Sequence, residues 1–172
     1  VPIAAPHGDD DYKRPIEKPL VVLNAGSSSL KFALFDSGAP LVRLGSGVID
    51  RIGSTAATFV SKGVAGLLTE RVTISAPDHV SGLGYLLKHL AETVRVARFG
   101  AVGHRVVHGG PRYRDPQRVD DTMIEELRRI SSFAPNHLPS AIALMETFTK
   151  EFPQVPQIAC FDTAFHHTMP RV

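Results

Sequence analysis

Apolar and polar positions in the first half of the chain follow the short runs and turn signals typical of strands. The run at 20–23 is apolar at every position and lies between Pro19 and a turn that contains Gly26, which predicts a strand buried on both faces. Further strands are predicted at 30–36, 41–50, 57–61 and 67–75. The first half therefore predicts a set of strands joined by tight turns.

The period then changes to that of a helix. Residues 78–97 place one apolar face on a helix, with Asp78 as the N-cap; its members are Val80, Leu83, Leu86, Leu87, Leu90 and Val94. A strand is predicted next at 101–108, helices at 120–130 and 139–151, and a last strand at 155–161. This order predicts an α/β domain, a mixed β-sheet with flanking helices.

Composition narrows the class of protein. Of the 172 residues 43% are hydrophobic, enough to bury a core, while 19 Lys and Arg against 17 Asp and Glu leave a net charge of only +2. Such a balance argues against nucleic acid or an anionic membrane as partner. The single Cys160 excludes an internal disulfide, and no signal peptide or membrane span is apparent, so we expect a cytoplasmic protein.

The two ends of the chain carry further expectations. Residues 1–19 contain four prolines and the run Asp9–Asp11 without a helical or strand period, which indicates a flexible extension before a domain at 20–172. The chain starts without Met, and we expect it to have been processed or cut.

A Gly-Ser loop follows the first strand, in the segment 24–31 (NAGSSSLK). If the chain is extended from Ser27 onward, then Ser27, Ser29 and Lys31 point to one side and offer two hydroxyls and an ammonium to a phosphate group. The segment is not a Walker A loop, because Lys31 continues into a strand rather than a helix. A polar hairpin turn is the alternative.

A second segment, 103–110 (GHRVVHGG), places Arg105 in an otherwise apolar strand that ends in two glycines. Arg105 and Val107 share one face, and His104, Val106 and His108 share the other. A buried guanidinium needs an anionic partner, which is either a bound carboxylate or phosphate or a salt bridge in the core. The two histidines lack the helix and the glutamate of a zinc motif, which favours core or supporting roles.

Two more segments carry candidate chemistry. His137, between Pro135 and Pro139, lies where a helix is predicted to start, and is either a positioned ligand or a surface histidine. Asp162 directly follows the last predicted strand, where α/β proteins place ligand chemistry, and could hold Mg²⁺, act as a base or cap a helix. His166 and His167 do not add metal-ligand spacing.

Together these four segments resemble the acetate kinase (acetate/propionate kinase) family, at 24–32 (NAGSSSLKF), 103–110 (GHRVVHGG), 134–139 (APNHLP) and 161–170 (FDTAFHHTMP). The resemblance covers about 20–172 and implies the N-terminal domain of the acetate and sugar kinase/actin-like ATPase superfamily, which is ribonuclease H-like. It implies a homodimeric enzyme that uses ATP and Mg²⁺ to convert acetate reversibly into acetyl phosphate and ADP.

The resemblance also implies roles for single residues. Asn24, Ser27, Ser29 and Lys31 would line the phosphate and metal region, and Arg105 would hold the substrate carboxylate and the transferring phosphoryl group. His137 would hydrogen-bond that group, and Val107 would touch the acyl methyl. Asp162, with Asn24, would belong to the Mg²⁺ site. The residues beside His137, Asn136 and Leu138, depart from the family pattern. This departure leaves open whether acetate or propionate is the preferred substrate.

The residue types agree with this chemistry. A carboxylate acceptor has a pKa near ~4, so at pH 7 it is already an anionic nucleophile and needs no general base. Arg, Lys, hydroxyls and a divalent cation would bring two anions together and absorb charge. Family kinases are more than twice as long, so we expect this chain alone to be inactive or nearly so. A non-catalytic phosphate-binding or oligomerisation module and a propionate- or pyrophosphate-dependent kinase are the alternatives.

Overall fold

The computed structural model describes residues 18–63, 69–93 and 98–166 of the chain. Its elements are β1 (Leu20–Ala25), β2 (Ser29–Asp36), β3 (Val42–Asp50), β4 (Ala57–Lys62), β5 (Glu70–Ile74), α1 (His79–Thr93), β6 (Ala101–Val106), β7 (Gln117–Arg118), α2 (Asp121–Arg129), the 3₁₀ turn η3 (Ser131–Phe133), α3 (Leu138–Glu151), β8 (Gln157–Phe161) and α4 (Thr163–His166). Three of the predicted segments extend beyond the described residues. Most of the expected extension at 1–19 lies outside them, as do the start of the strand at 67–75 and the end of the helix at 78–97.

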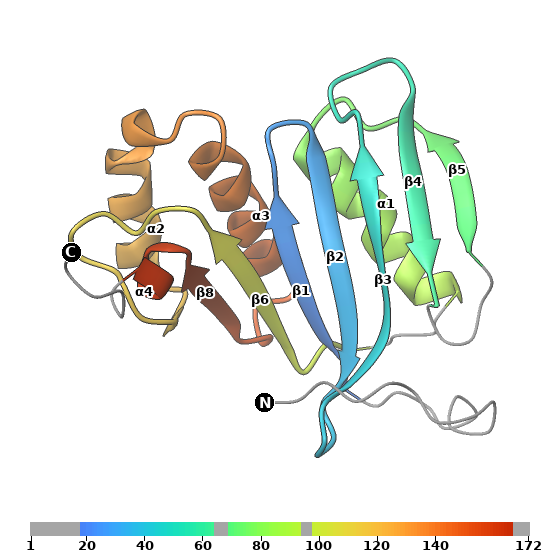
Figure 1. Cartoon of the computed structure of the whole chain (residues 1–172), viewed down its shortest axis with the longest axis horizontal. Coiled ribbons are helices and arrows are strands. Elements are labelled where there is room, and N and C mark those ends of the chain that lie inside the picture. The colour runs from blue at the N-terminus through green and yellow to red at the C-terminus, as the bar shows by residue number, and fades with distance from the viewer. Residues whose placement is uncertain (1–17, 64–68, 94–97, 167–172) are drawn as a thin grey trace.

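The strands form one mixed sheet in the order β5-β4-β3-β2-β1-β6-β8-β7. Strands β1 to β5 are antiparallel neighbours, whereas β1, β6 and β8 run parallel to one another. Helices α1 and α3 lie behind the sheet in Figure 1, and α2 packs against α3. The predicted α/β class, a mixed sheet with flanking helices, is confirmed.

The core lies between the sheet and these helices. Alternate residues of each strand point toward it, as in β2, where Leu30, Phe32 and Leu34 are buried and Lys31 is exposed. Leu83, Leu86 and Leu90 of α1 are fully buried against them, while Val80 of the predicted apolar face is 42% exposed because it lies beside the buried stripe. Asp78 caps α1 as predicted, since its Oδ1 accepts from Ser81 N at 2.7 Å.

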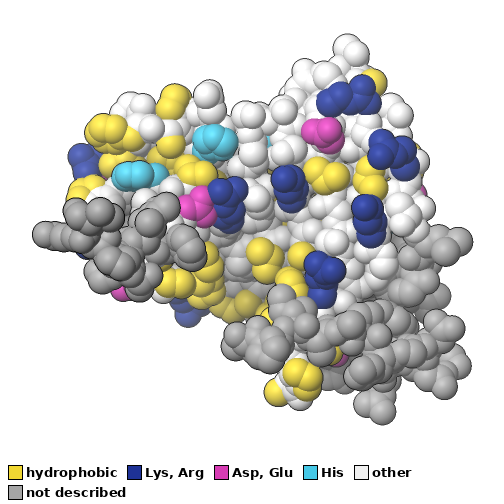
Figure 2. Space-filling model, in the orientation of Figure 1, with side chains coloured by type: hydrophobic (Ala, Val, Ile, Leu, Met, Phe, Trp, Pro, Cys, Tyr) yellow, Lys and Arg dark blue, Asp and Glu magenta, His cyan; other side chains and the backbone are white. Residues whose placement is uncertain are grey.

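The prediction that the first strand is buried on both faces is wrong. Val21 and Leu23 are buried, but Val22 on the opposite face is 41% exposed. No helix in the described parts of the chain covers that face of β1, which we call the open face; it is turned toward the viewer in Figures 1 and 2. This exposure is what leaves room for a site on the sheet.

Other differences concern short or irregular elements. The strand predicted at 101–108 ends at Val106, so Val107 and His108 lie beyond it. Strand β7, η3 and α4 were not predicted, because two to four residues are too few to show a period. No helix among the described residues is long and apolar enough to span a bilayer.

Candidate active site

Three parallel neighbours, β1, β6 and β8, end at the same edge of the sheet. Asn24 lies near the end of β1, Arg105 near the end of β6, and Asp162 directly after β8. In the register of the sheet Asn24 is opposite Arg105, which is opposite Cys160. The topology therefore brings together residues that are more than 50 positions apart in the sequence, at the edge where α/β proteins bind ligands.

The Arg105 guanidinium is held by two partners at this edge. Its Nε donates to Asp162 Oδ1 at 2.9 Å and Oδ2 at 3.1 Å, and its Nη2 to Asp162 Oδ2 at 2.5 Å. Its Nη1 donates to Asn24 Oδ1 at 3.1 Å. The hydrogen bonds that Arg105 donates to the Asp162 carboxylate raise the pKa of Arg105, so the group stays charged.

This pair differs from the buried ion pair considered for Arg105. The Arg105 and Asp162 side chains are 47% and 37% exposed. The predicted anionic partner is present. The prediction that the guanidinium is buried is wrong, because Arg105 points to the open face. An exposed guanidinium with one edge fixed by a carboxylate can still offer donors to a ligand.

Lys31 continues the same line of residues across the sheet. It is opposite Asn24 in the pairing of β1 with β2, so Lys31, Asn24 and Arg105 form a row over three adjacent strands. Two strand spacings separate the Cα atoms of Lys31 and Arg105 by roughly 10 Å. Figure 2 shows Lys and Arg side chains spread over this face, with acidic atoms directly beside basic ones near its middle. The row places one cation on each side of the Asn24 amide. This spacing suits a phosphoryl group and the groups bonded to it.

The Gly-Ser loop joins β1 to β2 beside this row. Gly26 N donates to Ser29 O at 2.8 Å, and Ile52 N donates to Ser28 O at 2.9 Å. Ser29 shares the open face with Lys31, whereas Ser27 lies in the turn before β2 rather than in the strand. Among the described residues neither serine hydroxyl has a hydrogen-bond partner, so both can serve a ligand.

His79, at the first position of α1, supports this loop and was not predicted. Its Nε2 is 2.7 Å from Gly26 O, so the ring donates to that carbonyl. The two residues are 53 positions apart, and only the packing of α1 against β2 brings them together. The helix start at 78–79 was the one available signal, and it says nothing about this contact.

His137 lies at the same edge by topology. Helix α3 ends five residues before β8 begins, and it packs against β6 and β1, so its start lies near the carboxyl ends of these strands. His137 is the N-cap residue of α3, and its half-buried ring makes no hydrogen bond with any described residue. The structure thus places His137 near the carboxyl edge of the sheet, where it forms no hydrogen bond with Arg105 or Asp162.

The segment after β6 has a rigid shape. Val107 is half-buried just beyond the strand, and His108 Nδ1 accepts from Gly110 N at 2.8 Å. A Cβ at Gly109 would lie 2.1 Å from the Tyr113 carbonyl oxygen, so only glycine fits there. His108 therefore has a supporting role, as considered from the sequence.

His104 is a core histidine. It is 2% exposed, and its Nε2 lies 2.7 Å from Gln157 Oε1. Burial lowers the pKa of His104 to about 4, although the hydrogen bond to Gln157 opposes this shift. The ring is neutral at pH 7 and takes no part in the open face.

Cys160 was missed as a neighbour of the site. Its side chain is exposed on the open face, opposite Arg105, and partial desolvation of its sulfur raises the pKa of its thiol. The alternation of buried and exposed positions in β8 could have placed it there.

The donor set for a metal ion is small. Within the residues that the structure describes, no three His, Cys, Asp or Glu side chains come together. Asp162 and Asn24 offer one carboxylate and one amide oxygen, each with acceptor capacity beyond the bonds from Arg105. Such a set fits Mg²⁺, which keeps several waters and takes its other ligands from phosphate.

Comparison with known proteins gives the class first. Solved structures that match this chain include acetate and propionate kinases, which have the actin-like ATPase fold. An acetate kinase of Porphyromonas gingivalis matches with a TM-score of 0.78 and 26% identity, and a propionate kinase of Francisella tularensis with 0.78 and 31%. Each match covers 89% of this chain and 39% of the other.

The chain belongs to the acetokinase family, whose model matches residues 19–172. The acetate kinase of Chromobacterium violaceum is 39% identical over 151 residues, and that of Bacillus subtilis is 40% identical over 154. These matches cover 88% of this chain but only 37% and 38% of the relatives. The chain therefore spans less than two fifths of the curated relatives it matches.

Proposed function

We propose that this chain supplies the acceptor and phosphoryl-binding side of an acetate kinase, which transfers the γ-phosphoryl group of ATP reversibly to acetate to give acetyl phosphate and ADP. One observation carries the proposal: the row of Lys31, Asn24 and Arg105 at the carboxyl edge of the sheet, with Asp162 bound to Arg105. Family membership supports a phosphotransferase, and this row supplies the charges that the reaction needs.

The reaction requires that two anions approach each other. Acetate is ionised at pH 7 and attacks the γ-phosphorus directly, so the bond from phosphorus to the β-bridging oxygen breaks as the new P–O bond forms, and ADP leaves. Arg105 and Lys31 would stabilise the negative charge on the transferring group and hold the carboxylate in line. The exposed donors of Arg105, which Asp162 and Asn24 orient, suit this role.

The remaining site residues take supporting parts in the proposal. The hydroxyls of Ser27 and Ser29 would donate to phosphate oxygens, and His137 would hydrogen-bond the transferring group from the start of α3. Val107 would contact the acyl methyl.

A magnesium ion, held by Asp162 and Asn24 with phosphate and water, would neutralise phosphate charge. The same family resemblance extends the proposal to a cytoplasmic homodimer.

Binding of acetyl phosphate tests the site in this chain itself. In ¹⁵N-labelled protein we expect saturating amide shifts at Asn24, Lys31 and Arg105. Arg105→Gln should weaken binding at least about 10-fold, because it removes charge-assisted hydrogen bonds. Arg71→Gln, an exposed arginine on the far strand β5, is the matched control and should bind as the wild type does. Equal affinity in both variants would refute the site.

Activity is a separate question, because the chain spans only part of its relatives. We propose that the chain alone is inactive or nearly so, since the charge-stabilised site would lack the groups supplied by the remainder. The assay is formation of acyl phosphate from ATP with acetate, propionate or butyrate, trapped as the hydroxamate. Turnover comparable to that of the Bacillus subtilis enzyme would overturn this statement. The similarity to a propionate kinase is the reason to include the longer acids.

A non-catalytic phosphate-binding module is the second candidate, because the row of Lys31, Asn24 and Arg105 alone offers contacts to an anion. Such a module would bind acetyl phosphate or inorganic phosphate at the same row without turnover. It differs from the first candidate in one result: addition of ATP and Mg²⁺ to the complete protein would produce no acyl phosphate.

A further inference from the structure

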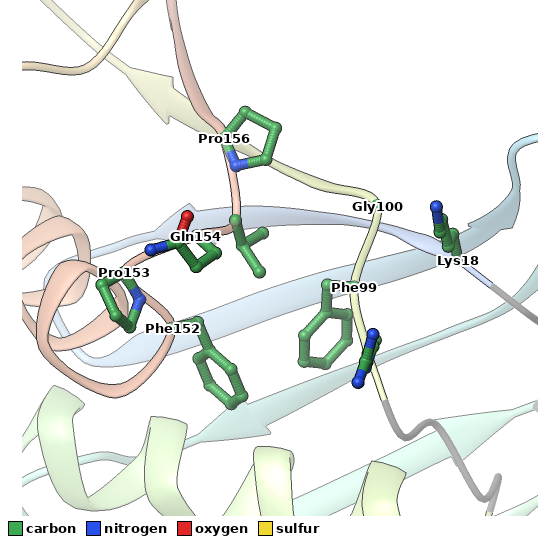
Figure 3. A pocket seen from close by; sticks show the side chains of 9 residues that line it. Lys18, Phe99, Gly100, Phe152, Pro153, Gln154 and Pro156 are labelled. Atoms are coloured by element: carbon green, nitrogen blue, oxygen red, sulfur yellow. The ribbon is translucent and has the colours of Figure 1, made fainter.

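A pocket lies at the opposite end of the sheet from the candidate active site. It is lined by residues at the starts of β1, β6 and β8 and after α3: Lys18, Arg98, Phe99, Gly100, Phe152, Pro153, Gln154, Val155 and Pro156 (Figure 3). Its volume is about 550 Å³, which is ordinary for a small-molecule site. Five- or six-residue strands separate it from the site by roughly 16–20 Å, so the two are distinct.

The wall of this pocket is apolar and aromatic. Phe99 and Phe152 meet edge to face, with ring centroids 5.6 Å apart, and Figure 3 shows both rings side by side beneath the loop 152–156. Phe99 is only 8% exposed and also packs on Phe148, so its ring is anchored in the core. A flat apolar group can pack against rings held in this way.

The backbone around the pocket is fixed before any ligand arrives. Gly100 N donates to Pro19 O, Val102 N to Pro156 O and Val155 N to Phe152 O, each at 2.9 Å. A Cβ at Gly100 would come within 2.7 Å of Lys18 O, so the two strand starts approach as closely as glycine allows. A preformed wall loses little conformational entropy on binding.

The charge of the pocket has one sign. Lys18 and Arg98 contribute an ammonium and a guanidinium, and no Asp or Glu is among the lining residues within the described parts of the chain. Both side chains are exposed, and neither forms an ion pair with another described residue. Two cations beside an apolar wall match a ligand with an apolar body and an anionic end.

We propose that this pocket binds small aromatic carboxylates, with the ring against Phe99 and Phe152 and the carboxylate on Arg98 and Lys18. The inference does not depend on the proposed kinase function, because it uses none of the residues of the Lys31–Asn24–Arg105 row. It assigns the chain a second ligand site at the opposite ends of the same strands.

The test compares three probes by amide chemical shifts of the ¹⁵N-labelled chain. Benzoate carries both features, benzamide keeps the ring without the charge, and acetate keeps the charge without the ring. Ligand efficiency puts a benzoate-sized ligand at a Kd of about 10 mM or tighter. We expect saturating shifts at Phe99, Gly100 and Val155 with benzoate, and at least 5-fold weaker binding of benzamide and acetate there.

Two variants separate charge recognition from a general loss of charge. Arg98→Gln should weaken benzoate about 10-fold, because a charge-assisted hydrogen bond is lost. Lys150→Gln removes an exposed charge from the last turn of α3 and should leave benzoate affinity unchanged. Since both replaced side chains are exposed, we expect both variants to fold.

Three results would overturn the proposal. The first is the absence of saturating shifts at the pocket up to about 50 mM benzoate, well above the expected Kd. The second is equal affinity for benzamide, which would show an apolar groove without anion recognition. The third is benzoate binding only at Asn24 and Arg105, which would refute this pocket while leaving the proposed function intact.

Discussion

Acidification should destabilise the fold through His104. This side chain is buried beside Phe148, with its Nε2 at 2.7 Å from Gln157 Oε1. The Gln157 Nε2 donates to Met145 O at 3.1 Å and to Thr149 Oγ1 at 2.8 Å, so Oε1 is left as the acceptor and His104 Nε2 is the donor. A protonated ring would bring an unpaired charge into the core.

The size of this effect follows from the pKa of His104 in the two states. It is about 4 in the folded protein and ordinary, 6.5, when unfolded. Above pH 6.5 both states are neutral and no stability is lost. Between pH 6.5 and 4 the unfolded state binds more protons, so the free energy of unfolding falls by about 2 kcal/mol at pH 5 and about 3 kcal/mol at pH 4.

Urea unfolding at pH 7, 6 and 5 measures this loss against His104→Gln, which cannot titrate. The variant should be less stable at pH 7 but should lose about 2 kcal/mol less between pH 7 and 5. His89, whose pKa burial also lowers, remains in both proteins and cancels in the comparison. The reasoning would be refuted if the free energy of unfolding fell equally in both proteins between pH 7 and 5. It would also be refuted if the His104 ring titrated near pH 6.5 in the folded state.

Three further predictions concern stability, each measured by urea unfolding. Gly109→Ala should lower the free energy of unfolding by about 2–3 kcal/mol, because the new Cβ would lie 2.1 Å from a carbonyl oxygen. The control Gly38→Ala, with nothing within 4 Å of the new Cβ, should change it by less than about 0.5 kcal/mol, and equal effects of the two variants would contradict this prediction. Asp120→Ala should cost about 1 kcal/mol, because its Oδ1 caps α2, and an unchanged midpoint would disprove the cap. Arg105→Gln should cost less than about 1 kcal/mol, because the ion pair with Asp162 is half exposed; a larger loss would show a structural role.

The sequence predicted the elements with strong periods. The apolar alternation of β2 and the helical face of α1 were readable because each pattern repeats over several residues. Strand β7 and η3 could not be predicted, since their few residues are defined by neighbours rather than by a period. Burial of the first strand on both faces was a wrong inference, because an apolar run alone does not say whether a second layer covers the sheet.

The candidate site shows the same division. Residue types alone indicated Lys31, Arg105 and Asp162 as candidate site residues, since phosphate chemistry calls for cations and an acidic partner. That Arg105 is bound to Asp162 and Asn24, and that Lys31 lies in register with them, depended on the parallel pairing of β1, β6 and β8. The roles of these residues in catalysis stay predictions.

The sequence by itself determined the local structure and the supply of chemical groups, because side-chain period and residue type act within a few positions. Only the tertiary structure decided which groups meet. The contact of His79 with Gly26 joins residues 53 positions apart, and that of Arg105 with Asp162 joins residues 57 apart. Such contacts depend on strand order and register, which are set by packing of the whole sheet against α1 and α3, and no local pattern encodes them.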